Sequence, residues 1–348
     1  MKKLYVWLYI VKKLILKEFK TGKNIPFNKK IWSWSKGFFS SSYVLYGLDG
    51  NDPEEYLSDY QENVKAIRLN DGYSEILDDK VKFSEIIKDF LKTPQDIAVI
   101  LNGRIMTLES SGNDLEISDI VSILKNESCL ILKPRYSAAG VGVLKIQGGK
   151  QGLSCNSTKI SEADFEDLLN KLDDYLITPC IKQAKYSNEI YSDTLNTIRV
   201  LTMVSPSGKP FISAAAHRFG TNKSFPVDNC NAGGITAFID THTGILGSAV
   251  FTYFDGIKLI KMDTHPDTGN PIKGVLIPGW NNVVEQLLTT AEKLSYLKYI
   301  GWDVVIRDKD FIILEGNNGP DIKLHQVHRP LLIDEETRDF FKYYNVIN

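Results

Sequence analysis

The feature that most constrains this chain is the stretch 301–317 near its C-terminal end. Two runs of β-branched and aromatic residues flank the polar tip 308–310, which predicts a β-hairpin. Side chains alternate across a strand, so the register decides which of them meet. If the tip forms a three-residue loop, Asp303 lies directly opposite Glu315, and Asn317 lies diagonally across on the same face.

The same register sorts the apolar residues of the hairpin onto the other face. Val304 and Ile306 then face Ile312 and Leu314. A register one residue shorter would place Asp303 beside Leu314 and mix apolar with acidic residues. A three-residue loop therefore gives one apolar face and one acidic face.

The acidic face of the hairpin points to a metal ion. Directly opposed carboxylates repel each other unless a positive charge lies between them. Two carboxylates and an amide oxygen suit a hard cation such as Mg²⁺, which takes a few protein oxygens together with phosphate oxygens. We therefore predict that Asp303, Glu315 and Asn317 bind Mg²⁺. A solvated acidic hairpin is the alternative, and the rest of the chain must decide between the two.

The composition limits the class of protein. With 348 residues the chain can bury a large core, and its length suggests two or three domains. Its 41 basic and 43 acidic residues give no electrostatic case for binding nucleic acid. Cys129, Cys155, Cys180 and Cys230 form no CxxC pair, which indicates neither a zinc site nor a dense disulfide framework. A reducing cytoplasm is the simpler expectation.

The N-terminal residues 1–20 are basic and apolar. The uncharged run 4–11 is about half as long as a membrane span requires. Lys12 and Lys13 interrupt the apolar run and no small-residue cleavage site follows, which argues against a signal peptide. An amphipathic helix fits better, either covering a domain or lying on the inner face of the membrane.

Hydrophobic patterns and turn signals predict a mixture of helices and strands. Helices are expected over 52–69, 84–91, 117–125, 161–172, 278–297 and 334–344. Strands besides the hairpin are expected over 97–101, 104–106, 129–133, 141–146, 175–181, 197–204, 211–216 and 235–239. The stretch 21–50 is expected to be an irregular connection. Several hairpins among mixed elements favour an α+β fold with largely antiparallel sheets.

The second informative stretch is 133–143, where a glycine-bearing loop joins two expected strands. Pro134 ends the first strand, and Gly140 and Gly142 bracket the entry into the second. Glycines let backbone N–H groups approach an anion, and Lys133 adds a positive charge. The loop is not a Walker A loop, and it opens a strand where a dinucleotide fingerprint would open a helix. An ordinary glycine hairpin is the alternative.

These features together resemble a known family. A Lys-Pro pair at a strand end, a glycine loop and a later D…E-x-N on a hairpin are similar to ATP-grasp enzymes, and more closely to the sugar-transfer-associated ATP-grasp proteins found with polysaccharide synthesis genes. The matching pieces follow the family's order from about residue 40 to 325. They are Asp79-Lys80, 133–143, 196–199, 228–229, 233–234, 265–269, 301–303 and 315–317.

The resemblance implies an ATP-grasp fold of two α+β lobes that clasp ATP. It implies an N-terminal helical or irregular region over 1–70 and a segment before the lobes over 71–127. The central lobe with the glycine-rich flap would span 128–182, and the C-terminal lobe with the metal site would span 183–348.

The resemblance also implies how ATP and Mg²⁺ are bound. Lys80 and Lys133 match the two phosphate lysines, and a solvated surface charge is the alternative for Lys80. Many ATP-grasp enzymes carry acidic residues at the adenine hinge, where this chain has Thr178 and Gln183, so Gln183 is our choice for the ribose contact. The implied nucleotide contacts are Lys80, Lys133, the flap residues Ser137, Gly140 and Gly142, the hinge residues Thr178, Cys180 and Ile181, and Gln183.

Four residues are implied to act in catalysis: Arg199, Lys133, His217 and Arg218. Arg199 lies in mid-strand among apolar neighbours, where an unpaired charge is costly. It resembles the arginine that meets a phosphate in the family, a natural use of its planar fork. A structural salt bridge is the alternative for Arg199, and a hydrogen-bonded core histidine is the alternative for His217.

Substrate contacts rest on the resemblance alone. The implied residues are Asn196, Asp228, Asn229, Gly233, Gly234, His265 and Lys323. His325 and His328 follow the hairpin together with Lys323 and could line the same cleft.

The function implied is that of an ADP-forming ligase. A carboxylate from a sugar acid or amino acid attacks the γ-phosphate of ATP, and an amine displaces phosphate from the acyl phosphate to form an amide. The setting implied is assembly of a capsule or other surface polysaccharide. A kinase acting on a hydroxyl, or a non-catalytic ATP-binding module of a glycosylation complex at the membrane, remains the alternative.

Overall fold

The computed structural model describes residue 18 and residues 25–108, 113–136, 140–149, 152–253 and 258–348. Apart from residue 18, the helix expected over 1–20 lies outside the described residues, and so does Ser137. None of the described helices has the length and apolar character needed to cross a bilayer.

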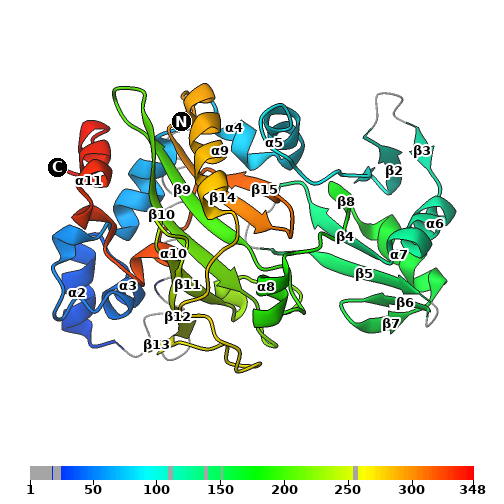
Figure 1. Ribbon diagram of the computed structural model, residues 1–348, viewed down its shortest axis with the longest axis horizontal. Helices are drawn as coiled ribbons and strands as arrows, with labels where there is room; N and C mark the ends of the chain where they lie inside the picture. The colour runs from blue at the N-terminus through cyan, green and yellow to red at the C-terminus, as the bar shows by residue number, and fades with distance from the viewer. Residues whose placement is uncertain (1–17, 19–24, 109–112, 137–139, 150–151, 254–257) are drawn as a thin grey trace.

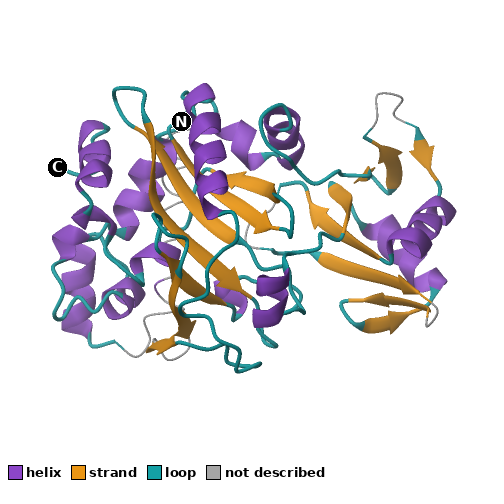
Figure 2. Ribbon diagram, in the orientation of Figure 1, coloured by secondary structure: helices purple, strands orange, loops and turns teal. Residues whose placement is uncertain are grey.

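The first sheet, at the right of Figure 1, is antiparallel, with the strand order β3-β2-β1-β8-β4-β5-β6-β7. These strands are β1 (Ala98–Leu101), β2 (Arg104–Thr107), β3 (Asp114–Leu115), β4 (Cys129–Pro134), β5 (Leu144–Gly149), β6 (Gly152–Cys155), β7 (Thr158–Ile160) and β8 (Tyr175–Pro179). Helices α6 (Ile117–Glu127) and α7 (Glu162–Lys171) lie beside this sheet (Figure 2). Leu124 and Phe165 of these helices are buried in its core. Because β1 pairs with β8, part of the stretch 71–127 shares this sheet with 128–182.

The second sheet is also antiparallel, with the strand order β13-β12-β11-β10-β9-β14-β15. These strands are β9 (Ile198–Val204), β10 (Pro210–Phe219), β11 (Ile235–Ile239), β12 (Leu246–Tyr253), β13 (Lys258–Met262), β14 (Tyr299–Ile306) and β15 (Phe311–Asn317). Two antiparallel sheets with helices on their faces confirm the predicted α+β fold.

Alternation along β9 separates the two faces of the second sheet. Ile198 and Val200 are buried in the cluster that contains α9 (Trp280–Lys293). Leu201 and Met203 are buried on the opposite face with Phe340 of α11 (Glu335–Tyr343). Odd-numbered residues of β9 therefore share the face away from α9, which decides where Arg199 points.

The N-terminal region packs against the second sheet, at the left of Figure 1. The stretch 21–50 is more regular than its composition suggests, since it contains α2 (Phe27–Ser35) and α3 (Ser40–Leu45). Aromatic residues of this stretch, such as Tyr43, are buried in a cluster with Val250 and Val327, so tertiary packing stabilises short helices that the sequence pattern alone does not predict.

The single helix expected over 52–69 is wrong. The segment instead contains short 3₁₀ turns at Pro53–Glu55 and Ala66–Arg68 and a π-helical turn at Gln61–Lys65. Between them, the buried side chain of Gln326 accepts a hydrogen bond from the N–H of Leu57 at 2.8 Å and donates one to its carbonyl oxygen at 3.0 Å. These bonds replace the helical ones and hold the segment against the C-terminal part of the chain.

Other predicted elements differ at their ends or were missed. The helix expected from 84 is α5 (Lys80–Ile87), which follows α4 (Ser74–Asp78) and begins earlier because the buried Asp79 accepts a hydrogen bond from the N–H of Val81. The remaining short helices are α8 (Lys185–Ile190) and α10 (Lys323–Gln326). Strands β3, β6, β7, β12 and β13 and helices α4, α8 and α10 were not predicted.

Candidate active site

A cavity of about 700 Å³ lies where the two sheets meet, with walls from both. Strands β4, β5 and β8 contribute from the first sheet, and β9, β10, β14 and β15 from the second. Most of the residues predicted to bind ATP or metal line it: Lys80, Lys133, Gly140, Thr178, Cys180, Ile181, Gln183, Asp303, Glu315 and Asn317. The predicted catalytic residues Arg199 and Arg218 and the predicted substrate residues Asp228 and Asn229 line it too. A cavity of this size is in the range of ligand sites.

The hairpin of β14 and β15 brings the predicted acidic pair together. Asp303 is paired directly with Glu315, and Asn317 is paired with Gly301, two positions along. The predicted opposition of the two carboxylates is therefore confirmed, with Asn317 diagonal to Asp303.

The tip of the hairpin differs from the prediction. Ile306 is paired with Phe311, and the N–H of Arg307 donates to the carbonyl oxygen of Asp310, so the chain turns at Asp308 and Lys309 and not through a three-residue loop. At the tip the register is thus the shorter one, and Val304 faces Ile313.

A β-bulge next to Asp303 restores the register needed by the acidic pair. The extra residue is Leu314, which lines the cavity beside Glu315. A bulge re-aims side chains at one point of a strand, so this hairpin places an apolar and an acidic residue on the same wall. Alternation alone cannot predict that arrangement.

Asp303 is held by two guanidinium groups. Arg199 donates from Nε to Oδ1 at 2.5 Å and from Nη2 to Oδ2 at 3.2 Å, while Arg218 donates to Oδ2 at 2.9 Å. Burial alone would raise the pKa of Asp303, but the two arginines hold it at about 2. Asp303 is therefore ionised throughout the physiological range.

Arg199 takes part in a buried ion pair, as the alternative interpretation expected, and it also lines the cavity. It lies on the face of β9 away from α9, directly beside β14, where Asp303 is its paired neighbour. Its third nitrogen donates to the carbonyl oxygen of Pro320. Removing either partner would leave a buried charge uncompensated, which typically costs 3–5 kcal/mol.

Arg218 links Asp303 to a second carboxylate, Asp228. The hydroxyl of Thr197 accepts a hydrogen bond from Nε of Arg218 at 2.9 Å and donates one to Asp228 at 2.5 Å. Asp228 also accepts the N–H of Thr197 at 2.8 Å. Burial raises the pKa of Asp228, although Arg218 opposes that shift.

Glu315 faces Lys80, whose Nζ lies 3.4 Å from Oε2. Burial and the neighbouring Asp303 raise the pKa of Glu315, so this carboxylate favours a nearby cation. The amide nitrogen of Asn317 donates to the carbonyl oxygen of Gly301 at 3.0 Å, which leaves its oxygen for a ligand.

These oxygens fit a hard metal ion. Among the described residues no group of three His, Cys, Asp or Glu side chains is arranged to hold a metal, so the set depends on the amide oxygen of Asn317. Asp303 must share oxygens that already accept hydrogen bonds from arginine. Carboxylate and amide oxygens with room for phosphate match the preference of Mg²⁺.

The base of the glycine-bearing loop carries Lys133, whose Nζ lies 3.2 Å from Oδ1 of Asp96. Gly140 has φ +69°, and a Cβ there would lie 3.0 Å from Val227 of the other wall. Gly142 has φ +79°, and a Cβ there would lie 2.8 Å from the hydroxyl of Tyr175. Both positions therefore require glycine for backbone conformation and close packing.

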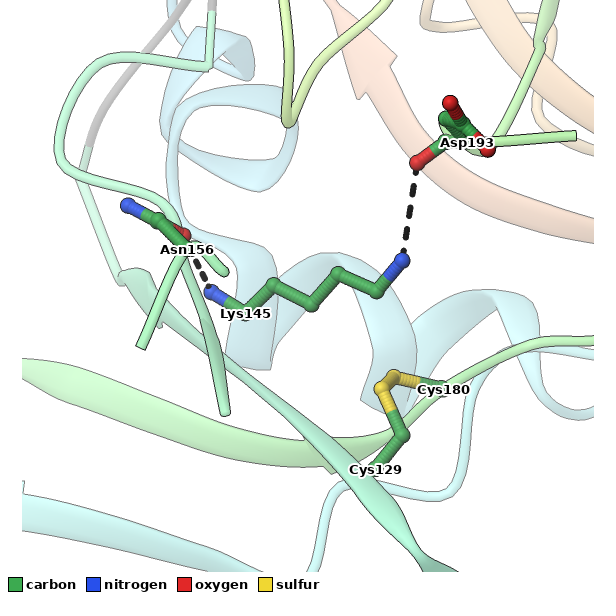
Figure 3. The surroundings of a disulfide bond; sticks show 5 residues. All are labelled: Cys129, Lys145, Asn156, Cys180 and Asp193. Atoms are coloured by element: carbon green, nitrogen blue, oxygen red, sulfur yellow. Dashed lines mark hydrogen bonds between the residues drawn. A yellow bond between two sulfur atoms is a disulfide. The ribbon is translucent and has the colours of Figure 1, made fainter. Parts of the chain in front are cut away.

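The residues of the predicted adenine hinge line the cavity. The hydroxyl of Thr178 is buried and has no hydrogen-bond partner among the described residues, as expected for a group that faces an absent ligand. Cys180 is joined to Cys129 by a disulfide, because β8 lies beside β4 (Figure 3). Cys155 and Cys230 are free thiols. The sequence analysis predicted no dense disulfide framework, and the described residues contain this single disulfide.

Gln183 lines the cavity, but its polar atoms are used within the protein. Its amide nitrogen donates to the carbonyl oxygens of Tyr191 and Thr194, and its oxygen accepts from Ser187 and from the N–H of Asn196. These bonds fix the hinge to the loop that follows α8. They argue against the ribose contact chosen for Gln183.

Two predicted histidines lie away from the cavity. His217 alternates with Arg218 on β10, so it faces the core, where the hydroxyl of Tyr186 lies 2.9 Å from its Nε2. Burial lowers the pKa of His217 to about 3. His265 is buried against Tyr191 and lies 2.8 Å from the carbonyl oxygen of Gly220 through Nε2. Neither His217 nor His265 lines the cavity, so the structure does not support their predicted catalytic and substrate roles.

Three predicted substrate residues support the fold instead. Asn196 donates to the carbonyl oxygen of Tyr191 at 2.7 Å and accepts the N–H of Gly220. Gly233 adopts φ +114°, and at Gly234 a Cβ would lie 2.5 Å from the carbonyl oxygen of Asp228. These residues shape the turn that presents Asp228 and do not line the cavity.

The residues after the hairpin border a second, smaller pocket. Lys323 lines it and forms a 2.7 Å ion pair with Asp59. His325 is buried, and neither of its ring nitrogens has a hydrogen-bond partner among the described residues. His328 lies 3.4 Å from the hydroxyl of Thr236. Of the three, only Lys323 lines a pocket.

Sequence reasoning missed a clamp that connects the glycine-bearing loop to α5. Arg135 donates two hydrogen bonds to the buried Asp79, at 2.8 and 2.6 Å, and the hydroxyl of Tyr136 donates to the same carboxylate at 3.1 Å. Because Asp79 precedes Lys80, this clamp fixes Lys80 relative to the loop. Its signal in the sequence was the pair Asp79-Lys80, of which only the lysine was given a role.

A second missed residue is Lys145 on β5, which lines the cavity. Figure 3 shows its ammonium group reaching toward Asp193, whose carbonyl oxygen lies 3.5 Å away. The other lysines that line the cavity are Lys80, Lys133 and Lys182. Alternation from Val143 onward could have identified it.

No curated protein is significantly similar to the chain in sequence. Among solved structures, the chain is similar to a D-alanyl-alanine synthetase A from Vibrio cholerae, with 10% identity, a TM-score of 0.44 and coverage of 78% of this chain and 66% of that chain. It is also similar to an ADP complex of N5-carboxyaminoimidazole ribonucleotide synthetase (11% identity, TM-score 0.42, 78% and 57% covered). The chain thus spans less than two thirds of the length of either.

A model of the family described as sugar-transfer associated ATP-grasp matches residues 64–336. This range includes the glycine-bearing loop, the hinge and the hairpin, which together build the cavity between the two sheets. The match covers well over half of the sequence, and the chain therefore belongs to the sugar-transfer associated ATP-grasp family.

Proposed function

We propose that this protein is an ATP- and Mg²⁺-dependent ligase that joins a carboxylate to an amine through an acyl phosphate. The observation that carries the proposal is the cavity between the sheets, where Lys80 and Arg218 contact the opposed carboxylates Glu315 and Asp303 and Lys133 lines the same cavity. Such a site suits a polyphosphate and its metal ion, since it holds both cations and oxygen ligands.

ATP would lie with its base at the hinge and its phosphates at the lysines. The unpartnered hydroxyl of Thr178 and the backbone of Ile181 line the hinge end of the cavity. Lys80 lies beside Glu315 of the acidic hairpin, Lys133 lines the same cavity, and Gly140 would let the loop approach the phosphates. Because the polar atoms of Gln183 are engaged, we propose no ribose contact for it.

Asp303, Glu315 and Asn317 would hold Mg²⁺, which would neutralise phosphate charge when bound. Arg199 and Arg218 both donate hydrogen bonds to Asp303, and we propose a different role for each. Arg218 lies between Asp303 and Asp228 and can donate to an oxygen that gains charge. Arg199 keeps Asp303 ionised and in place, so it is a positioning residue in this proposal.

The reaction has two steps. The substrate carboxylate attacks the γ-phosphate, the bond to the β-phosphate oxygen breaks, and ADP leaves. The amine then attacks the acyl carbon, and phosphate leaves with the electron pair of the broken C–O bond. No covalent enzyme nucleophile is needed.

The biological setting is also a proposal. The family description supports a role beside sugar transfer, so we propose a sugar acid or amino acid as the carboxylate and surface polysaccharide as the destination. The use of ATP favours the cytoplasm, and residues 1–20 are the segment we propose for contact with the membrane or glycosylation machinery.

ADP release measured with a panel of uronic acids and amino acids, with and without amines, tests the proposal. We expect turnover to require one carboxylate and one amine. Turnover with a hydroxyl compound alone, yielding a phosphorylated product, would instead identify a kinase.

A further inference from the structure

A second pocket of about 180 Å³ adjoins the ATP cavity. The two share Cys230, Asn231, Gly319, Asp321 and Leu324 as lining residues, so they adjoin each other along these residues. A dry cavity of about 150 Å³ is known to hold benzene, so the pocket has room for a ligand group of roughly six or more heavy atoms.

The outer wall of this pocket comes from the N-terminal region. Leu45, Glu62, Asn63 and Ile67 line it, and the first three precede the part of the chain matched by the family model. Glu62 is fixed in place, because its Oε1 accepts the N–H of Ile322 at 2.9 Å. The N-terminal region is therefore part of a site and not only a cover for the second sheet.

The charge of the pocket is acidic. Its carboxylates are Glu62 and Asp321, and its one lysine, Lys323, is paired with Asp59 at 2.7 Å. Among the described residues neither Glu62 nor Asp321 has a cation within ion-pair distance. Two such carboxylates in a buried pocket favour a cationic ligand.

A separate observation points to a ligand. Tyr299 lines the pocket, its side chain is 1% exposed, and its hydroxyl has no hydrogen-bond partner among the described residues. Tyr299 lies on β14 four residues before Asp303, on the same face of the strand, so the pocket and the acidic hairpin share one wall. A buried hydroxyl without a partner is costly unless a ligand or water satisfies it.

We propose that this pocket binds the amine substrate as its ammonium ion, with Asp321 and Glu62 as its counter-ions, Tyr299 as a hydrogen-bond partner and Glu62 as the proton acceptor. The inference rests on the proposed ligase function. It assigns the amine to the smaller pocket, which adjoins the ATP cavity and is not lined by the hinge residues.

The chemistry balances with residues that are present. The ammonium ion loses one proton to Glu62, and the free electron pair of nitrogen forms the C–N bond. The C–O bond to phosphate breaks with its electron pair on phosphate, which takes the second proton from nitrogen. Burial and Asp321 raise the pKa of Glu62 to about 7, which suits a group that accepts and returns a proton near neutral pH. The other ionisable groups near Glu62 in the described part of the chain include Lys323, Asp59, Tyr46 and Tyr299.

The test uses Glu62→Gln and Asp321→Asn, with Glu54→Gln as the matched control. Glutamine keeps an oxygen that can accept the N–H of Ile322, and asparagine tolerates the positive φ of +54° at position 321. Glu54 is an exposed acid in the same N-terminal region, paired only with Lys36 at the surface. All three variants are expected to fold.

Two readouts separate this inference from the function on which it rests. Hydroxylamine at high concentration traps an acyl phosphate as a hydroxamate and does not need the amine pocket. With the carboxylate that supports turnover, we expect hydroxamate formation within twofold of wild type in all variants, and a KM for the amine at least tenfold higher in Glu62→Gln and Asp321→Asn. The rate of the amine-dependent reaction should fall below about pH 7 in wild type, and this dependence should be lost in Glu62→Gln.

Unchanged KM for the amine in both variants, with hydroxamate still formed, would overturn the assignment of the pocket alone. Absence of hydroxamate in wild type with every carboxylate would overturn the ligase proposal, and this inference with it.

Discussion

The ATP cavity and the smaller pocket beside it differ in how their carboxylates are balanced. In the cavity, Asp303 has two arginines and Glu315 has Lys80. In the smaller pocket, Glu62 and Asp321 lie together without a cation within ion-pair distance in the described part of the chain. The first arrangement suits phosphate and metal, whose charges largely cancel, and the second suits an ammonium ion. Two sites that share a wall are thus distinguished by local charge.

The largest expected effect is the loss of the acidic pair of the hairpin. Asp303→Asn and Glu315→Gln should each lower ADP production at least a hundredfold, because each removes a ligand charge from the proposed metal site. We use amides because asparagine at position 303 keeps an oxygen that can accept a hydrogen bond from Arg199 or Arg218, which alanine would not. The exposed Glu335→Gln is the control. ADP production that survives both substitutions would exclude the hairpin as the metal site.

Removing the disulfide tests whether the two sites are independent, because Cys180 lines the ATP cavity and not the smaller pocket. Cys129→Ser should lower the free energy of unfolding by about 2–4 kcal/mol, because the bridge closes a loop across a sequence separation of 51 residues. Since Cys180 lines only the ATP cavity, the KM for ATP should rise and the KM for the amine should not. Chemical denaturation with and without reductant measures the first effect. Equal changes in both KM values would show that the sites are not independent.

The lysines of the cavity should affect ATP and not the amine. Lys80→Met and Lys133→Met are each expected to raise the KM for ATP about 10–50-fold, equivalent to roughly 1.5–2.5 kcal/mol of lost charge-assisted bonding. Lys92→Met, at an exposed surface pair with Asp310, serves as the control and should change little. A rise confined to the KM for the amine would reverse the assignment of the two sites.

The smallest predicted effect is a gain in stability in the acidic pocket. Burial and Asp321 raise the pKa of Glu62 to about 7, above its value in the unfolded chain. Glu62 therefore supports folding at low pH, and that contribution is lost as the pH rises toward about 7. Glu62→Gln should thus be more stable than wild type by about 2 kcal/mol at pH 8 and equal to it near pH 4. Thermal unfolding across this range tests the sign, and a variant less stable at pH 8 contradicts it.

The sequence predicted the cavity better than the pocket, for a physical reason. Several cavity residues, among them Arg199, Asp303 and Glu315, lie on strands, whose alternation identifies those that share a face. Others lie in a glycine-bearing loop with a recognisable composition. The pocket is built where Glu62 of an irregular segment meets Asp321 after the hairpin. That contact depends on tertiary bonds such as Gln326 to Leu57, for which the sequence carries no local signal.

Alternation also explains the errors within the cavity. Arg218 and His217 are neighbours on β10, so only one of them can face the site, and the motif that suggested both did not specify which. The bulge at Leu314 could not be foreseen, because it combines the shorter register at the tip with the predicted opposition of Asp303 and Glu315. The ribose contact was assigned to Gln183 because the sequence does not show its internal hydrogen bonds. They are to residues 11 and 13 positions later, which the fold brings beside it.

The central claim is that ATP is used to join a carboxylate to an amine. The most direct test measures ADP release by the purified full-length chain with Mg²⁺, ATP, and uronic acids or amino acids offered with or without an amine. We predict turnover only with both substrates, and an amide product whose amount equals the ADP released. ADP formed equally well with a hydroxyl compound in place of both, and recovered together with a phosphorylated product, would contradict the claim.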